Sequence, residues 1–253
     1  MKDKLVKELI DYFVIESKEY QNLTIPNTYQ ERRLLLRGLI NMRMPMPLGE
    51  DILDKEDKLL QLELKEKGIA DINSLKEIEK NIYLWMGDIT TLNADIIVNA
   101  DNNDGLGCFN PTHHCIDNAI HTFAGIRLRL ECNDILNGNQ LNTGDIIVCE
   151  SFNLPCKKVI TTVGPQIYRT ITKDDEGKLS NCYKNSLEYA IHNGYKTIAF
   201  PSISTGLFGY PISKAKLIAY KTVREYTDKY DIKVIFDVFS KEDYDEYREL
   251  FKS

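Results

Sequence analysis

Six short apolar runs, all after residue 75, constrain the fold of this chain more than any other feature of its sequence. They are rich in β-branched residues, which is typical of strands covered on both faces of a sheet. Helical stretches separate several of them, so helices must cover both sides, and we predict a three-layer α/β/α sandwich around a mostly parallel or mixed sheet. The expected strands cover residues 82–86, 95–100, 145–149, 159–163, 197–201 and 234–239, and the expected helices cover residues 117–132, 179–193, 212–229 and 241–252.

The chain before residue 76 has a different pattern. In its first helical stretch, Leu5, Leu9 and Phe13 recur at the spacing of one helix face. No chemistry-bearing motif is visible there, which favours a cap or flank for the α/β part. We predict an N-terminal helical extension at residues 1–75 and an α/β domain at residues 76–253. The helices expected in the extension cover residues 2–20, 27–43 and 50–67.

Charge and hydropathy argue against two classes of partner. The chain has 32 Lys and Arg against 38 Asp and Glu, a net charge of -6, whereas non-specific nucleic-acid binding needs a positive field. No run approaches the roughly 18 apolar residues of a membrane span, and the N-terminus lacks the uninterrupted apolar core of a signal peptide. We expect a cytoplasmic protein without nucleic-acid or membrane partners, whose six cysteines are free thiols or metal ligands.

The densest group of metal-ligating residues directly follows the second expected strand. His113, His114 and His121 are three of the four histidines, and they lie close to Cys108 and Cys115. Two thiolates and one imidazole in the pattern Cys-x4-His-x-Cys suit zinc and leave a fourth position for water or substrate. His114 is an alternative to His113 as the ligand. The competing interpretation is that both thiols are simply packed and that His113 lies at the surface.

Two carboxylates flank this loop, and each allows two interpretations. Asp117 lies in the first turn of the following helix, where free backbone amides stabilise it, or it orients a hydroxyl or water beside the metal. Asp101 is either a solvated carboxylate at a strand end or a base whose pKa a nearby cation depresses. His121, one turn after Asp117, is expected to be a packed, hydrogen-bonded core residue.

Residues 201–211, Pro-Ser-Ile-Ser-Thr-Gly-Leu-Phe-Gly-Tyr-Pro, form a second informative segment. It follows a buried strand and precedes a helix. Gly206, Gly209 and the small hydroxyl residues let backbone amides approach an anion closely, and the next helix can present its positive end. The same residue types also make ordinary turns, so the segment alone indicates an anion site without establishing it.

Together these segments resemble the macrodomain family, and within it the zinc-dependent branch. Gly-Asp-Ile-Thr at residues 87–90 is similar to the motif whose Asp contacts the adenine of ADP-ribose. Val-Asn-Ala-Asp-Asn at residues 98–102 resembles the segment that holds the distal ribose, and residues 204–211 resemble the loop around the diphosphate. Residues 116–121 match the helix start after the catalytic loop. In that loop Cys108, Pro111, His113 and Cys115 replace the usual run of glycines.

The resemblance, over about residues 76–253, implies a hydrolase that removes mono-ADP-ribose from modified protein side chains. It implies the type linked to bacterial sirtuin-like ADP-ribosylation systems, with one zinc per chain. By this resemblance the zinc ligands would be Cys108, His113 and Cys115. We expect the catalytic residues to be Asp117, Asn102 and Asp101, with Asp117 or Asp101 helping to activate a water. Zinc would either orient ribose hydroxyls or lower the pKa of a water. The residues expected to contact ADP-ribose are Asp88, Ile89, Asn102, Ser204, Thr205, Gly206, Leu207, Phe208, Gly209 and Phe239.

One alternative and two departures accompany this resemblance. The alternative is a non-catalytic module that binds ADP-ribose and carries a structural zinc, which a fourth protein ligand would favour. Asp101 stands where the family usually has Ala, which places an extra carboxylate near the ribose. Thr161 stands where the family often has His. Both departures bear on how the substrate is oriented.

Overall fold

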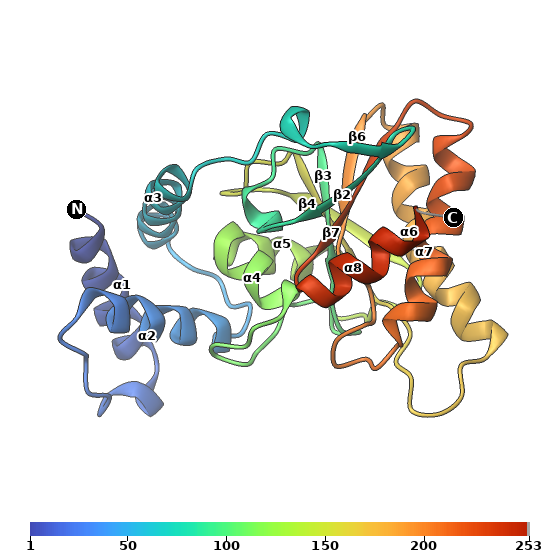
Figure 1. Ribbon diagram of the computed structural model, residues 1–253. Helices are drawn as coiled ribbons and strands as arrows, with labels where there is room; N and C mark the ends of the chain where they lie inside the picture. The colour runs from blue at the N-terminus through green and yellow to red at the C-terminus, as the bar shows by residue number, and fades with distance from the viewer. Residues whose placement is uncertain (252–253) are drawn as a thin grey trace.

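The computed structural model describes residues 1–251 and shows a seven-stranded mixed sheet between two layers of helices (Figure 1). The strand order is β1-β2-β7-β6-β3-β5-β4, and only the two edge pairs, β1 with β2 and β4 with β5, are antiparallel. The predicted three-layer α/β/α fold is therefore confirmed. The strands are β1 Glu77–Glu79, β2 Ile82–Met86, β3 Ile96–Ala100, β4 Ile146–Glu150, β5 Lys158–Thr162, β6 Thr197–Phe200 and β7 Lys233–Val238.

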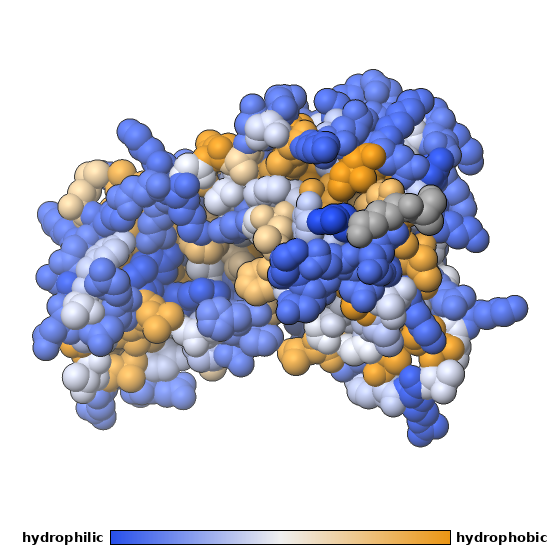
Figure 2. Space-filling view, in the orientation of Figure 1, coloured by the Kyte–Doolittle hydropathy of each residue, from blue (hydrophilic) through white to orange (hydrophobic). Residues whose placement is uncertain are grey.

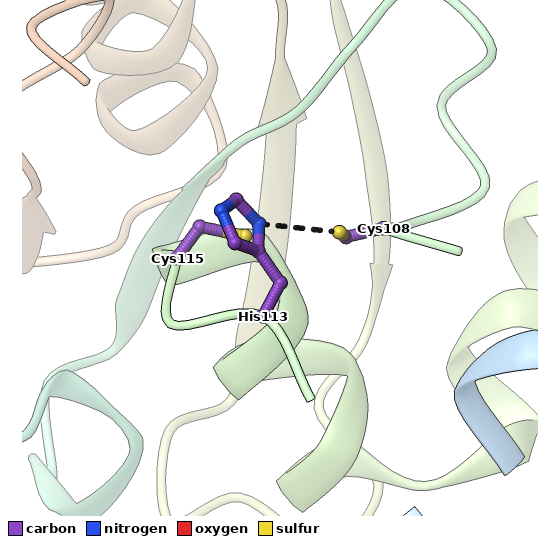
Figure 3. A group of neighbouring side chains, drawn as sticks. All are labelled: Cys108, His113 and Cys115. Carbon is purple, nitrogen blue, oxygen red and sulfur yellow. Dashed lines mark hydrogen bonds between the residues drawn. The ribbon is translucent and has the colours of Figure 1, made fainter. Parts of the chain in front are cut away.

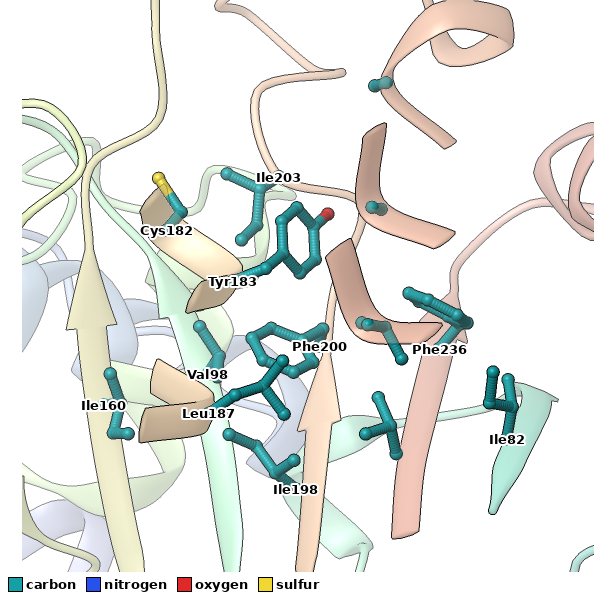
Figure 4. Packing of buried hydrophobic residues seen from close by; sticks show 14 of the residues in the cluster. Ile82, Val98, Ile160, Cys182, Tyr183, Leu187, Ile198, Phe200, Ile203 and Phe236 are labelled. Carbon is teal, nitrogen blue, oxygen red and sulfur yellow. The ribbon is translucent and has the colours of Figure 1, made fainter. Parts of the chain in front are cut away.

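Both faces of the sheet are buried because successive strand residues point to opposite sides. In β3, Ile96 and Val98 pack in the core formed with α6, α7 and α8, part of which Figure 4 shows. Ile97 lies between them and packs in the core formed with α4 and α5. This double burial explains why the strand is apolar at every one of these positions. The helices are α4 Ile116–Ala124, α5 Ile126–Leu136, α6 Lys173–His192, α7 Ile212–Thr227 and α8 Lys241–Leu250.

The N-terminal extension packs beside α4 and α5 (Figure 1). Its helices are α1 Lys2–Glu16, α2 Tyr29–Met42 and α3 Glu50–Lys67. They share an apolar core that also includes Ile126 and Leu130 of α5, while their outer surface is mostly hydrophilic with scattered apolar patches (Figure 2). The division of the chain at residue 75 stays a prediction. Within residues 1–251, no helix has both the length and the apolar character to cross a membrane.

Two of the helix predictions are wrong because a helix ends early. The stretch expected at residues 117–132 is two helices, broken at Gly125, whose φ of 95° suits glycine. A side chain at Gly125 would also approach Leu60 of α3, at 3.1 Å from its Cδ1. The stretch expected at residues 2–20 ends at Glu16, and a separate 3₁₀ turn, Lys18–Tyr20, follows.

Other differences lie at element boundaries. Helix α6 begins at Lys173 rather than at residue 179, because Thr172 and Asp175 form a reciprocal capping box. Strand β1 was not predicted, since its sequence Glu-Ile-Glu is polar and it lies at the sheet edge. The last helix ends at Leu250, and residue 252 of the predicted helix lies outside the described residues. The remaining strands and helices agree with their predicted ranges within two residues.

Candidate metal and ligand-binding site

Cys108, His113 and Cys115, which we call the thiol cluster, lie together in the loop between β3 and α4 (Figure 3). Their ligand atoms all fall within 4.8 Å of one another, and Cys108 Sγ lies 3.5 Å from His113 Nδ1. All three side chains are half-buried, so solvent reaches them. The structure thus brings together the three residues that the sequence pattern singled out. His114 is exposed and outside the group.

Helix α4 positions one end of the thiol cluster. Cys115 is the N-cap residue of this helix, and its Sγ accepts a hydrogen bond of 3.3 Å from the amide of Asn118. Burial, with smaller contributions from Asp117 and Cys108, raises the pKa of the Cys115 thiol to about 12. A divalent cation has the opposite effect, because only the thiolate binds it.

The donor set of the thiol cluster fits zinc. Two sulfur atoms and one imidazole nitrogen are the ligands that a borderline-soft ion prefers. Among residues 1–251, no fourth His, Cys, Asp or Glu joins this group. Three protein ligands leave one coordination position for water or substrate, which is the pattern of catalytic rather than structural zinc sites.

A second group of ligand atoms, the carboxylate cluster, consists of Asp101, Asp117 and His121, all buried. Asp117 Oδ1 accepts a hydrogen bond of 2.8 Å from Asn99 Nδ2 and lies 3.5 Å from His121 Nε2. Asp101 Oδ2 accepts from the amide of Gly107 at 3.1 Å, at the start of the metal loop. Its Oδ1 accepts from the backbone and side-chain nitrogens of the next residue, at 2.7 and 3.0 Å.

Burial governs protonation in the carboxylate cluster. It raises the pKa of Asp101, and it raises the pKa of Asp117 well above the usual range, with the nearby charge of Asp101 adding to the effect. Burial and the Arg129 cation lower the pKa of His121 to about 3. The cluster therefore holds a neutral imidazole at neutral pH, and both of its carboxyl groups take up a proton more readily than exposed carboxyl groups do.

Two expectations about this cluster are wrong. Asp101 is only 4% exposed, so it is not the solvated carboxylate of the first alternative. Burial raises its pKa in the protein alone, and its role as a base beside a metal stays a prediction. His121 is packed in the core as expected, but within the described chain neither ring nitrogen has a hydrogen-bond partner. Both errors arise because the sequence shows neither the depth of the loop nor the approach of Arg129.

The predicted diphosphate loop after β6 is partly open. Ser204 is buried with φ of 67°, and its Oγ is a buried atom without a partner in the described residues. Gly206 and Leu207 are exposed, and a Cβ at Gly206 would meet no atom within 4 Å. Gly209 N donates to Gly206 O at 3.0 Å, which closes the turn. The loop leaves room for an anion above its tip, with Thr205 and Phe208 half-buried beside it.

The predicted adenine end lies where β2 and β7 finish side by side, with Met86 paired to Val238. This register brings the segments that hold Asp88 and Phe239 to the same end of the sheet, and Phe239 is 88% exposed. Asp88 Oδ1 accepts from Thr90 N at 3.0 Å. Burial alone would raise the pKa of Asp88, but hydrogen bonds from Thr90 and Lys67 outweigh it and lower the pKa.

All these segments follow the carboxyl ends of parallel strands, so they lie along one edge of the sheet, where ligands of open α/β sheets bind. Ile89 is buried there, so its side chain packs in the core and does not face a ligand. Asn102 is half-buried, and its Oδ1 accepts from the amide of Asp104 at 2.8 Å. Thr161 is fully buried in β5, 3.5 Å from Asn99 Nδ2.

Sequence reasoning missed several residues that support this site. Asn99 positions Asp117, and Asn118 contacts Cys115 and the loop, yet both read as ordinary polar residues in the sequence. Arg37 and Lys67 reach the site from the extension, across a separation that no local pattern could reveal. The local signals were the motifs at residues 98–102 and 116–121, which included Asn99 and Asn118 without assigning either a role.

Comparison with known proteins supports the fold, and the similarity to relatives extends over most of the chain. Residues 98–219 match the model of the Macro domain family. A "Protein-ADP-ribose hydrolase" of Treponema medium is 42% identical over 250 residues, 96% of each chain. One from Staphylococcus aureus (strain MRSA252) is 38% identical over 255 residues, 97% of this chain and 96% of that one. Both alignments are too long to leave out the helical extension.

Two solved structures resemble the α/β part. The Oceanobacillus iheyensis macrodomain with ADP has a TM-score of 0.63 and 38% identity, covering 70% of this chain and 94% of that chain. The Trypanosoma brucei macrodomain in complex with ADP-ribose has a TM-score of 0.65 and 26% identity, covering 89% and 96%. Given the matched residues 98–219, the shared sheet and the relatedness of nearly the whole chain to the Treponema medium protein, this chain belongs to the macrodomain family.

Proposed function

We propose that the chain is a zinc-dependent hydrolase that removes mono-ADP-ribose from modified protein side chains. The observation that carries this proposal is the convergence of Cys108, His113 and Cys115 beside the buried carboxyl of Asp117, at the ligand-binding edge of a macrodomain sheet. Relatives named protein-ADP-ribose hydrolase at 38–42% identity support the hydrolase activity.

The binding edge would hold ADP-ribose in an extended arrangement. Asp88 and Phe239 would frame the adenine at the ends of β2 and β7. The amides around Gly206 would receive the diphosphate, since the space above that residue is open. Asn102 would then place the distal ribose near the thiol cluster. This order follows the order of the strands, from β7 through β6 to β3.

Zinc held by Cys108, His113 and Cys115 would supply one of two kinds of chemistry. It would bind ribose hydroxyls and so orient the anomeric carbon, or it would lower the pKa of a water. Two thiolate ligands neutralise its charge, which makes it a weaker Lewis acid than a zinc ion held by neutral ligands. The open fourth position is compatible with both roles.

Asp117 is the best placed of the predicted catalytic carboxyls to carry a proton. Burial and the neighbouring charge of Asp101 raise its pKa, which favours a role as a proton carrier, and Asn99 fixes one of its oxygens. Both oxygens of Asp101 already accept backbone amides, one of them from Gly107. Asp101 therefore has the contacts of a group that shapes the loop, and its role as a base stays a prediction.

Two further parts of the proposal concern the setting of the enzyme. All six cysteines are free thiols, which suits a reducing compartment, and we propose a cytoplasmic location. The modification to be reversed would be made by a transferase of the sirtuin-like type, as the resemblance to the zinc-dependent branch implies.

The test is incubation of the protein with a mono-ADP-ribosylated protein, with and without a metal chelator, following the release of free ADP-ribose. We expect release in the untreated sample, loss of release after chelation, and recovery when zinc is returned. Release that survives complete removal of zinc would contradict the metal-dependent part. Binding of ADP-ribose without any release would favour the non-catalytic alternative.

A further inference from the structure

One face of α2, in the extension, lies directly against the metal loop. Arg37 Nε and Nη2 donate to Asn118 Oδ1 at 3.1 and 2.5 Å, and Nη2 also donates to the carbonyl of His113 at 3.2 Å. One guanidinium thus holds the backbone of one predicted ligand. Through Asn118, whose amide donates to Cys115 Sγ at 3.3 Å, it also holds a second ligand.

The next turn of α2 continues this contact. Asn41 Nδ2 donates to the carbonyl of Pro111 at 3.2 Å and to Asn118 Oδ1 at 3.1 Å. Asn118 Nδ2 donates in turn to the carbonyl of Asn110 at 2.8 Å. Asn118 is fully buried, and its hydrogen bond with Asn41 is shielded from water.

Gly38 provides an independent sign that α2 and the metal loop fit closely. It lies inside a helix, where glycine costs about 1 kcal/mol relative to alanine. A Cβ at this position would lie 3.3 Å from Pro111 Cβ. The close approach of the loop to the helix therefore explains a residue that disfavours the helix.

Arg129 of α5 joins the other end of α2 to the start of the metal loop. Its Nη1 donates to the carbonyls of Ile40 and Asn41 in the last turn of α2, both at 3.0 Å, and to that of the C-cap residue Arg43 at 2.8 Å. Its Nε donates to the carbonyl of Leu106 at 2.7 Å, and its guanidinium lies 4.6 Å from the centre of the Phe109 ring. The loop is therefore held to α2 at both ends.

The charge of Arg37 lacks a carboxylate partner. Within residues 1–251 it forms no salt bridge, whereas Arg33, one turn earlier, pairs with Glu63 at 2.6 Å. A half-buried cation without an anion is costly. Burial lowers the pKa of Arg37, and the thiolates of Cys115 and Cys108, which exist when a metal is bound, would oppose that effect.

We propose that Arg37 is a positioning residue of the metal centre, and that the extension, through α2, holds the metal ligands in place. This inference rests on the proposed zinc site. Arg37 fixes His113 and, through Asn118, Cys115 in place before the metal arrives, and its charge offsets the two thiolates afterwards. Removing such a support for metal ligands typically weakens metal binding about 10- to 100-fold.

The test compares Arg37→Gln with the control Arg33→Gln, which removes a cation from the same helix but leaves the loop contacts intact. Zinc affinity is measured by competition with a chromogenic chelator, and unfolding of the metal-free proteins is followed by circular dichroism. We expect Arg37→Gln to bind zinc about 10- to 100-fold more weakly at unchanged metal-free stability, and Arg33→Gln to bind zinc like the parent. Arg37→Lys keeps the positive charge but loses the forked donors of the guanidinium, and its zinc affinity should lie between those of the parent and Arg37→Gln.

Amide hydrogen exchange of residues 106–118 in the metal-free proteins separates this inference from the zinc proposal. Exchange should be faster in Arg37→Gln than in Arg33→Gln, because the loop loses its attachment to α2. If the parent bound no zinc, the zinc proposal would fail, and equal exchange in the two variants would then also overturn the role of Arg37. The proposed role of Arg37 is likewise overturned if Arg37→Gln and Arg33→Gln have zinc affinities within about threefold of each other and equal amide exchange.

Discussion

The thiol cluster and the carboxylate cluster both include a residue at the start of α4, and they differ in burial and in charge. Cys108, His113 and Cys115 are half-buried on a loop, where an ion can enter and a fourth ligand can exchange. Asp101 and Asp117 are buried, and their protein surroundings raise the pKa of both. This comparison suggests that the thiol cluster binds a metal, while the carboxylate cluster carries a proton.

The difference also has a structural cause. The thiol cluster is built on a loop whose backbone is tied to α2, so its geometry depends on the extension. The carboxylate cluster is built on the end of β3 and the first turns of α4, within the sheet's own packing. Replacing a thiol-cluster ligand should therefore leave the carboxylate cluster in place, and replacing Asp117 should leave the thiol cluster in place.

The largest expected effect follows removal of a metal ligand. Cys115→Ala or Cys108→Ala should lose zinc, and turnover should fall about 10³-fold. Metal chemistry lowers the activation free energy by several kcal/mol, and about 1.4 kcal/mol corresponds to a tenfold change in rate. Elemental analysis should find about one zinc per chain in the parent and none in these variants. Cys182→Ala, a buried thiol in the core on the other face of the sheet, is the control and should keep the metal. Full zinc in Cys115→Ala would remove that residue from the site.

Asp117→Asn should have the next largest effect. Turnover should fall about 10²-fold, the usual scale for losing acid or base help, while zinc content stays at the parent level. The metal-free variant should be at least as stable as the parent, because a buried carboxyl next to Asp101 is replaced by a neutral group. Single-turnover rates, zinc analysis and urea unfolding measure these three quantities. Loss of zinc in Asp117→Asn would show that the two clusters are not separate.

Asp101→Ala should act mainly on stability. Its two oxygens accept the amides of Asn102 and Gly107, and removing them leaves buried donors without acceptors. We expect unfolding free energy to fall by about 2 kcal/mol, with a smaller loss of turnover than in Asp117→Asn. Urea unfolding and turnover of the two variants are compared side by side. A greater loss of turnover in Asp101→Ala at unchanged stability would make Asp101 the base after all.

Gly206→Leu should give the smallest effect and touch neither cluster. The space above Gly206 is open, so the variant should fold normally and keep its zinc. The added side chain would occupy the position proposed for the diphosphate, and ADP-ribose affinity measured by calorimetry should fall at least about tenfold, or 1.4 kcal/mol. An unchanged affinity would move the anion site away from this loop.

How much the sequence predicts depends on the range of the interactions. The buried strands were predicted closely because double burial makes each strand apolar on its own, as in Ile96 and Ile97. The thiol cluster was found because its residues are neighbours in the chain. The break at Gly125 and the contacts of Arg37 were missed, because both depend on segments more than 50 residues away. The raised pKa values of Asp101 and Asp117 follow from burial, which no local motif reports.

X-ray absorption at the zinc edge tests the central claim most directly, because it identifies the atoms around the metal in the parent protein. If the thiol cluster holds zinc, the spectrum will show two sulfur atoms at about 2.3 Å and one imidazole nitrogen at about 2.0 Å, completed by one lighter exchangeable ligand. A shell of oxygen and nitrogen without sulfur would place the metal in the carboxylate cluster and contradict the account. Four sulfur and nitrogen ligands from protein would make the site structural and contradict its catalytic role.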